Sequence, residues 1–307
     1  MGYVWKRFEE QQLTWLVRLI LVLAVFTGAG AAFASVPDDN SAASLHAKHA
    51  ALANRLHDNP FKRALYLDSS ETSSGLKGDV YTLVDYPMAR VSAALDDPAH
   101  WCEVLILHIN TKHCRASAGR NGNVLTVSVG RKTAQPLEDA YPIEFAYRAA
   151  SVTPSYLEIR LDAEKGPMST SNYRILLQAV PIGKGQTFMR LTYSYDYGLA
   201  GRLAMKSYLA TIGSDKVGFT PVGRQSNGEP EYIGGVRGVV ERNTMRYYLA
   251  IDSYLASLSS PPPLQIQRRL QSWYAATEQY PRQLHEIGRT AYMDMKQGEY
   301  LRQQASY

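Results

Sequence analysis

The stretch from Asn172 to Tyr197 constrains the fold more than any other part of this sequence. In its second half, apolar or aromatic residues alternate with polar ones, and this period of two indicates a β-strand. The tripeptide Gly183-Lys184-Gly185 precedes that half and supplies the backbone freedom of a hairpin turn. One face would carry Met189, Leu191, Tyr193, Tyr195 and Tyr197, and the other Arg190, Thr192, Ser194 and Asp196. We therefore predict a hairpin with arms at about 172–180 and 186–197, the second arm being half-buried.

The first 34 residues have the composition of a secretory signal peptide. Basic residues precede the apolar run Leu19–Phe26, and the segment ends in Ala32-Phe33-Ala34, an A-x-A cleavage site. The run is shorter than the roughly 20 apolar residues of a membrane span. We therefore predict a signal peptide at 1–34 and a periplasmic location. The alternative is an uncleaved N-terminal anchor, since Trp15-Leu16-Val17 lengthens the apolar part.

The charge of the chain bears on its partners. The formal net charge is +5 over 307 residues, and the surplus is spread along the sequence. Nucleic-acid-binding proteins carry a clustered basic face, so we predict no nucleic-acid partner. A weak contact with an anionic membrane surface is compatible with the charge. The part after the signal peptide is long enough for one domain with a sizeable core and extensions.

The only two cysteines, Cys102 and Cys114, are predicted to form a disulfide, because exported proteins with an even number of cysteines commonly oxidise them. His100, His108 and His113 lie close by in sequence, which makes a metal site the alternative. Their spacing matches no standard zinc signature. We predict neither a metal nor another cofactor.

Several shorter elements precede the hairpin. Residues 41–56 predict a helix with Leu45, Leu52 and Leu56 on one face, and residues 68–78 have the composition of a loop. Asp79–Asp85 predicts a strand, and two short helices follow, Met88–Leu95 and one that starts at Asp97-Pro98. Further strands are predicted at Val124–Val129, Ile143–Ala149 and Tyr156–Leu161. Together with the hairpin, these strands indicate an antiparallel meander. Charged residues of the meander, Arg148, Glu158, Arg160, Arg174 and Arg190, are expected to face solvent.

Helices dominate the end of the chain. Gly198–Thr211 predicts an amphipathic helix, and Val217–Gly223 with Glu231–Val236 predicts a second hairpin. The strongest helical pattern is Arg237–Leu258, ended by Pro261-Pro262-Pro263. Its polar side, expected to face solvent, carries Glu241, Arg242, Arg246 and Asp252. Two polar helices are predicted beyond the prolines, at Gln265–Tyr280 and Arg282–Gln303.

This order of elements resembles the helix-grip fold of the START-like (SRPBCC) superfamily, here as an exported bacterial member. The resemblance is carried by the Asp79–Asp85 strand, the helices between Tyr86 and His108 and the Arg237–Leu258 helix, and by no sequence motif. It implies an α+β domain at 76–260, in which a curved antiparallel sheet wraps the long C-terminal helix around an apolar cavity. Residues 35–75 would be a helical segment and linker, Gly198–Thr211 an insertion and 261–307 a helical extension.

The resemblance and the tyrosine-rich face together predict a pocket between the sheet and the long helix. Its candidate lining residues are Tyr193, Tyr195, Tyr197, Tyr247, Tyr248, Ile251 and Trp101. The alternative is that these residues only pack the sheet onto the helix. The sequence contains no G-x-S-x-G, H-E-x-x-H, Walker A or dinucleotide-binding motif, and we predict no catalytic residue.

Three functions are compatible with this sequence. START-like proteins bind lipids, sterols and other hydrophobic molecules, so the first is a periplasmic binding protein for a hydrophobic or amphipathic small molecule. The second is a cyclase or hydrolase, for which Asp196 and His108 are the titratable candidates. The ordinary roles of these two residues are a helix N-cap and a hydrogen-bonded core histidine. The third is an envelope scaffold that uses the Arg- and Gln-rich segment 264–307 as its contact surface.

Overall fold

A computed structural model describes residues 40–198 and 216–305, which lie within one compact unit, Asp39–Tyr307. The predicted signal peptide and nearly all of the predicted Gly198–Thr211 helix lie outside the described residues. Among the described helices, none is both long enough and apolar enough to cross a membrane.

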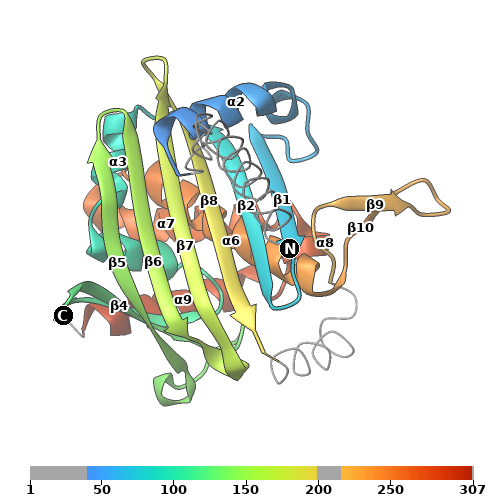
Figure 1. Ribbon diagram of the computed structural model, residues 1–307. Coiled ribbons are helices and arrows are strands. Elements are labelled where there is room, and N and C mark those ends of the chain that lie inside the picture. The colour runs from blue at the N-terminus through green and yellow to red at the C-terminus, as the bar shows by residue number, and fades with distance from the viewer. Residues whose placement is uncertain (1–39, 199–215, 306–307) are drawn as a thin grey trace, which may run out of the picture. The chain divides into compact units, whose positions relative to one another are not determined.

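Eight antiparallel strands form one curved sheet with the order β1-β2-β8-β7-β6-β5-β4-β3 (Figure 1). Strands β4 to β8 form the predicted meander, and β3 pairs with β4 at one edge. At the other edge β2 pairs with β8, so the β1–β2 hairpin extends the sheet there. With the helices described below, this sheet confirms the predicted α+β class. The strands are β1 (Leu65–Glu71), β2 (Gly75–Val84), β3 (Thr111–Gly119), β4 (Gly122–Val129), β5 (Tyr141–Thr153), β6 (Tyr156–Lys165), β7 (Thr170–Ile182) and β8 (Gln186–Tyr197).

The hairpin that organises the sequence is present as β7 and β8. Ile182 pairs with Gln186 across the turn, and Gly183 has a φ of 61°. Glycine adopts this left-handed conformation without the steric cost that a Cβ would bring. The second predicted hairpin is also present but shorter, as β9 (Pro221–Arg224) and β10 (Pro230–Tyr232), and it projects away from the sheet in Figure 1.

The sequence analysis missed two strands, β1 and β3, and both lie at the edges of the sheet. The predicted loop at 68–78 contains the end of β1 and the start of β2, so that prediction is wrong. Ser69, Ser70 and Glu71 nevertheless pair with β2. An edge strand needs few apolar residues because it has one neighbouring strand and faces solvent on its other side. The strand pattern is therefore weak in both segments.

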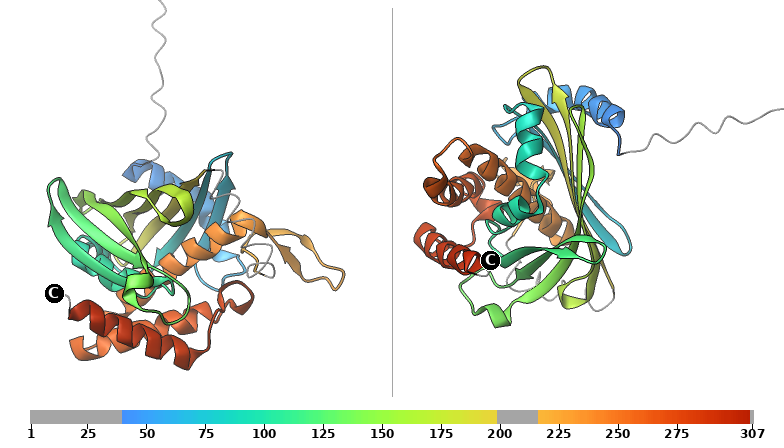
Figure 2. Two further views of the ribbon diagram at one scale, coloured as in Figure 1. Left: turned by 90° about the horizontal axis from the view of Figure 1, so that it is seen from below. Right: turned by 90° about the vertical axis from the view of Figure 1, so that its left-hand side faces the viewer.

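Helix α2 (Ala42–His57) covers one face of the sheet (Figure 2). Ser41 caps its first turn, and the side chains of Ser41 and Ser44 each accept a hydrogen bond from the other residue's backbone N–H. The leucines predicted on one face of this helix cluster with Tyr81, Val180 and Phe188 of the sheet. Strand β8 is consequently buried on both faces, and the prediction that it is half-buried is wrong.

Charged side chains on the face covered by α2 are buried, which corrects the expectation that they face solvent. The Nε of Arg190 donates to Asp79 at 3.0 Å, and its Nη1 lies 3.5 Å from Gln178. Glu158 accepts hydrogen bonds from Tyr156 and Arg160, each at 2.6 Å. Each buried charge therefore has a partner on a neighbouring residue, as burial requires. The solvent prediction holds for Arg148 and Arg174, which are mostly exposed and pair with Asp162.

The remaining long helices lie on the opposite side of the sheet (Figure 2). They are α3 (Met88–Leu95), α4 (Pro98–Leu105), α6 (Gly235–Ser257), α7 (Pro262–Thr277) and α9 (Arg289–Gln304); α8 (Pro281–Leu284) is a single turn, and two short 3₁₀ turns lie at Leu137–Asp139 and Pro167–Ser169. Asp97 caps α4 through the backbone N–H of Ala99. Helix α6 packs against β1, β2 and β8, which places it between the sheet and α7.

Glu241, Arg242 and Arg246 on the polar side of α6 are buried, contrary to the expectation from its sequence pattern, whereas Asp252 is partly exposed and pairs with Arg63. Glu241 is fully buried and accepts hydrogen bonds from Ser69 Oγ at 2.6 Å and from Thr220 Oγ1 at 2.7 Å. Arg246 is also buried and donates to Glu286 at 2.6 Å. These partners come from β1 and from segments on either side of α6. Residues that are distant in sequence therefore bury a helix face whose composition is typical of solvent exposure.

Candidate functional site

The alternation along β8 directs its tyrosines toward α6. Tyr193 and Tyr195 are buried there, with ring centroids 5.6 Å apart. Tyr173 of β7 stacks on Tyr195 at 5.1 Å, and Tyr247 of α6 lies 5.1 Å from Tyr193. Spacings of this size are favourable for aromatic pairs. The four rings therefore form a continuous aromatic cluster between the sheet and α6, which we call the tyrosine cluster.

His108 extends the tyrosine cluster at the end of the α4 segment. Its ring stacks on Tyr247 with centroids 4.6 Å apart, and the backbone N–H of Asn110 donates to its Nδ1 at 3.2 Å. Burial, together with the nearby cations Arg246 and Lys296, lowers the pKa of His108 well below its ordinary value. The imidazole is therefore neutral at neutral pH, and because Nδ1 accepts, Nε2 carries the proton. This Nε2 is buried and has no partner in the described part of the chain.

The hydroxyls of the tyrosine cluster are also short of partners. Within residues 40–198 and 216–305, the hydroxyls of Tyr193, Tyr195 and Tyr247 make no hydrogen bond, whereas that of Tyr173 lies 2.8 Å from Thr170 Oγ1. Burial is the main cause that raises the pKa of each of the four phenols. The neighbouring phenol of Tyr173 raises the other three pKa values further. Tyr247 also keeps part of its surface accessible.

The structure thus brings three of the seven predicted lining residues, Tyr193, Tyr195 and Tyr247, into one cluster. The other four lie in the same core with different contacts. Tyr197 donates to Glu71 at 3.3 Å, Tyr248 accepts from Thr82 at 3.3 Å, and Trp101 donates to the carbonyl of Leu95 at 2.8 Å. Ile251 is buried in the apolar core.

Tyr173 was not predicted from the sequence, and His108 was named only as a titratable candidate for a catalytic function. Tyr173 begins the first arm of the hairpin, and a register shift between Ser171 and Arg174 determines its neighbours. That shift has no clear mark in the sequence. Asp196, the other titratable candidate, is half-buried on the opposite face of β8 and accepts a hydrogen bond from Asn172 at 2.8 Å.

The predicted disulfide is confirmed, because Cys102 of α4 is bonded to Cys114 of β3. The Cα atoms lie 5.2 Å apart, within the range that a disulfide spans. On the chain-entropy model, such a loop contributes about 3 kcal/mol to stability. In the described ranges, no group of three or more His, Cys, Asp or Glu residues, the neighbouring histidines included, is placed so that it could hold a metal ion.

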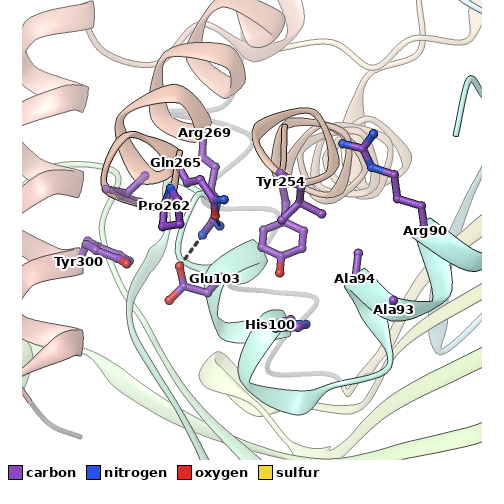
Figure 3. A pocket seen from close by; sticks show the side chains of 12 residues that line it. Arg90, Ala93, Ala94, His100, Glu103, Tyr254, Pro262, Gln265, Arg269 and Tyr300 are labelled. Atoms are coloured by element: carbon purple, nitrogen blue, oxygen red, sulfur yellow. Dashed lines mark hydrogen bonds and ion pairs between the residues drawn. The ribbon is translucent and has the colours of Figure 1, made fainter. Parts of the chain in front are cut away.

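A cavity of about 450 Å³ lies outside the tyrosine cluster, among the helices (Figure 3). Helix α3 contributes Arg90, Ala93 and Ala94, and α6 contributes Tyr254, whose side chain projects toward His100 of α4. Arg269 of α7 donates to Glu103 of α4 at 2.5 Å across the far wall. Sequence reasoning gave no indication of this pocket, because its walls come from five separate helices. The full lining is Arg90, Ala93, Ala94, His100, Glu103, Tyr254, Leu258, Pro262, Gln265, Ile266, Arg269 and Tyr300.

Comparison with known proteins found partial structural likenesses. No family model matches the chain, and no curated protein matches its sequence. A conserved protein from Geobacillus kaustophilus is similar at 16% identity and TM-score 0.31, covering 45% of this chain and 85% of that one. Norcoclaurine synthase from Thalictrum is similar at 11% identity and TM-score 0.33, and the match covers 47% of this chain and 93% of that one. Human StAR-related lipid transfer protein 5 is similar at 8% identity and TM-score 0.32, and the match covers 55% of this chain and 89% of that one.

Proposed function

We propose that this protein binds a hydrophobic or amphipathic small molecule, of lipid-like character, between the sheet and α6. The observation that carries this proposal is the buried Nε2–H of His108, which has no hydrogen-bond partner among the described residues, together with three phenol hydroxyls beside it that make no hydrogen bond within those residues. Buried polar groups are nearly always paired, and an unpaired one costs about 1–3 kcal/mol. A ligand with a few hydrogen-bonding groups and an apolar body would pair them and bury its remainder against the rings.

The order of the elements supports the same assignment. Strand β2, helices α3 and α4, the meander and α6 follow one another as in the START-like superfamily. We further propose that the chain is exported to the periplasm and cleaved after Ala34. Sequencing the N-terminus of protein purified from the envelope fraction tests this. A retained residue 1 or 2 would instead support the uncleaved anchor.

Native mass spectrometry of the purified protein tests ligand binding. We expect the wild type to carry a small-molecule adduct that solvent extraction releases. The double substitution Tyr193→Phe and Tyr247→Phe removes two polar contacts but keeps the rings, so adduct occupancy should fall. The matched control is Tyr66→Phe, since Tyr66 lies on the face covered by α2 and its hydroxyl accepts from Arg55.

Two results would contradict the proposal. The first is equal occupancy in the double variant and the control, which would place the adduct elsewhere. The second is an adduct-free wild type that fails to take up dodecanol or dodecanoate when these are added. In that case the tyrosine cluster would only pack the sheet onto α6.

A catalytic function is the second candidate, and the free Nε2 of His108 is the observation that favours it. Its lowered pKa makes the imidazole a weak general base at neutral pH. The other titratable candidate, Asp196, lies on the opposite face of β8 from the tyrosine cluster. Catalysis would require a second titratable group beside His108, whereas ligand binding does not, so we favour ligand binding. Chemical change of the released adduct during incubation with wild type, and its absence with His108→Gln, would instead support catalysis.

A further inference from the structure

The wall of the helix-lined cavity in Figure 3 includes an arginine, Arg90, without a counter-ion among the described residues. Arg90 of α3 makes no ion pair with the described residues; its closest polar partner is the backbone carbonyl of Leu255, 3.5 Å from Nη2. The guanidinium also lies over the ring of Tyr86, at 4.8 Å. Arginine stays charged at all physiological pH values. Arg90 therefore brings to the cavity wall a positive charge that no carboxylate of the described residues pairs.

The other charged residues of the cavity neutralise one another. Arg269 is buried, and its three donor nitrogens bind Ser257 at 2.9 Å, Glu103 at 2.5 Å and Gln265 at 2.8 Å. Its guanidinium lies 4.5 Å from the centre of the Tyr254 ring, which holds that ring in place. This wall thus positions Tyr254 without offering a free charge.

Two polar atoms of the cavity have no hydrogen-bond partner within residues 40–198 and 216–305. Tyr254 is buried to 2% exposure, and its hydroxyl makes no hydrogen bond in the described chain. Figure 3 shows this side chain projecting from α6 toward His100, between Arg90 and the Arg269–Glu103 pair. The Nδ1 of His100 is also buried and unpaired. A donor and a second polar atom therefore lie in the wall of the same cavity as Arg90.

The rest of the wall is apolar and leaves room for a ligand. Ala93 and Ala94 follow Arg90 on the same helix, and their small side chains open the cavity beside Leu258 and Ile266. The volume of about 450 Å³ lies within the range of small-molecule sites.

We propose that this cavity binds a small organic monocarboxylate with an apolar body. The carboxylate would pair with Arg90 and accept a hydrogen bond from the Tyr254 hydroxyl, and the body would lie on the alanines and Ile266. A monoanion fits better than a phosphate dianion because only one cation is uncompensated and Glu103 lies across the cavity. This site is separate from the tyrosine cluster, so it does not depend on the function proposed above.

Isothermal titration with octanoate, benzoate and the neutral analogue octanamide tests the proposal. Octanoate should bind the wild type at least tenfold more tightly than octanamide, since octanamide lacks the charge that Arg90 pairs. Comparing octanoate with benzoate separates an acyl-chain acid from a compact aromatic one. Octyl phosphate should bind more weakly than octanoate.

Variants locate the binding. Arg90→Gln should weaken octanoate binding at least tenfold, and Tyr254→Phe should weaken it severalfold. The matched control is Arg268→Gln, which removes the same charge from an exposed position of α7 and should leave the affinity unchanged. The loss of affinity caused by Arg90→Gln should be the same in a Tyr193→Phe background, which distinguishes this cavity from the tyrosine cluster. Circular dichroism melts establish that each variant is folded. Equal affinities for octanoate and octanamide, or wild-type affinity in Arg90→Gln, would overturn the proposal.

Discussion

At the scale of single residues, Tyr193 and Tyr292 are both buried, but their hydroxyls differ. Tyr292 donates to the carbonyl of Leu107 at 2.9 Å, while the hydroxyl of Tyr193 has no partner in the described chain. Removing a paired hydroxyl leaves a buried carbonyl unsatisfied, whereas removing an unpaired one relieves a desolvation cost. The same substitution should therefore have opposite effects at the two positions.

We predict that Tyr292→Phe lowers the free energy of unfolding of ligand-free protein by about 1–2 kcal/mol. Tyr193→Phe should leave it unchanged or raise it by up to about 1 kcal/mol. Urea unfolding followed by circular dichroism measures both. A loss at Tyr193 as large as that at Tyr292 would show that the Tyr193 hydroxyl is satisfied without a ligand.

At the scale of elements, α9 is held to the start of β3 by buried polar contacts. Lys296 donates to Glu299 and to the carbonyl of Thr111, each at 2.6 Å, and Lys112 donates to Glu299 at 3.0 Å. Gln303 accepts from the backbone N–H of Cys114 at 3.0 Å, beside the disulfide. The Glu299 carboxylate thus accepts hydrogen bonds from two buried lysines. Burying the charged amine of Lys296 costs free energy, which offsets part of the stabilisation from these bonds.

This cost predicts a pH dependence of stability. Burial lowers the pKa of Lys296 to about 8, even though Glu299 opposes the shift, from 10.5 for an exposed lysine. Between these values the unfolded chain binds more protons than the folded one, so the free energy of unfolding should rise with pH. Lys296→Met should remove this rise. Urea unfolding of both proteins from pH 7 to pH 9.5 measures the difference, and equal slopes would contradict the prediction.

At the scale of the whole molecule, the C-terminal helices belong to the core. Leu270 and Trp273 of α7 and Tyr292 of α9 are almost completely buried, and Trp273 stacks on Tyr292 at 5.0 Å. Burying such a side chain contributes about 1.5–3 kcal/mol. The summed contribution of several such side chains is comparable to the total free energy of unfolding of a domain, about 5–15 kcal/mol.

We therefore predict that deleting residues 264–307 abolishes cooperative unfolding, because it exposes the core and leaves Lys112 without Glu299. Thermal circular dichroism and limited proteolysis measure this. The scaffold hypothesis expected the same deletion to leave the core folded, so a truncated chain that melts cooperatively would favour that hypothesis. A deletion confined to the projecting β9–β10 hairpin, residues 221–232, is the control and should change the melt little.

The sequence by itself determined the features that depend on a few neighbouring residues. The glycines at 183 and 185 and the alternation after them specified the β7–β8 hairpin, and Ser41 with the three leucines specified α2. The periodicity between 237 and 258 specified α6 to within two residues at its start. With only two cysteines, the disulfide had one possible pairing. Turn residues, caps and periodicity act within a few positions, which is why they are readable from the chain.

The tertiary structure alone decided which polar groups are buried and which side chains meet. Arg190 and Glu241 have the sequence context of solvent-facing residues, but Asp79 and Ser69, far away in the chain, enclose them. Strands β1 and β3 form because the sheet offers them a neighbour, not because their pattern is strong. The tyrosine cluster and the Arg90 cavity are likewise assembled from distant segments. Burial and partnership are properties of the assembled core, since each depends on atoms that no local stretch of sequence contains.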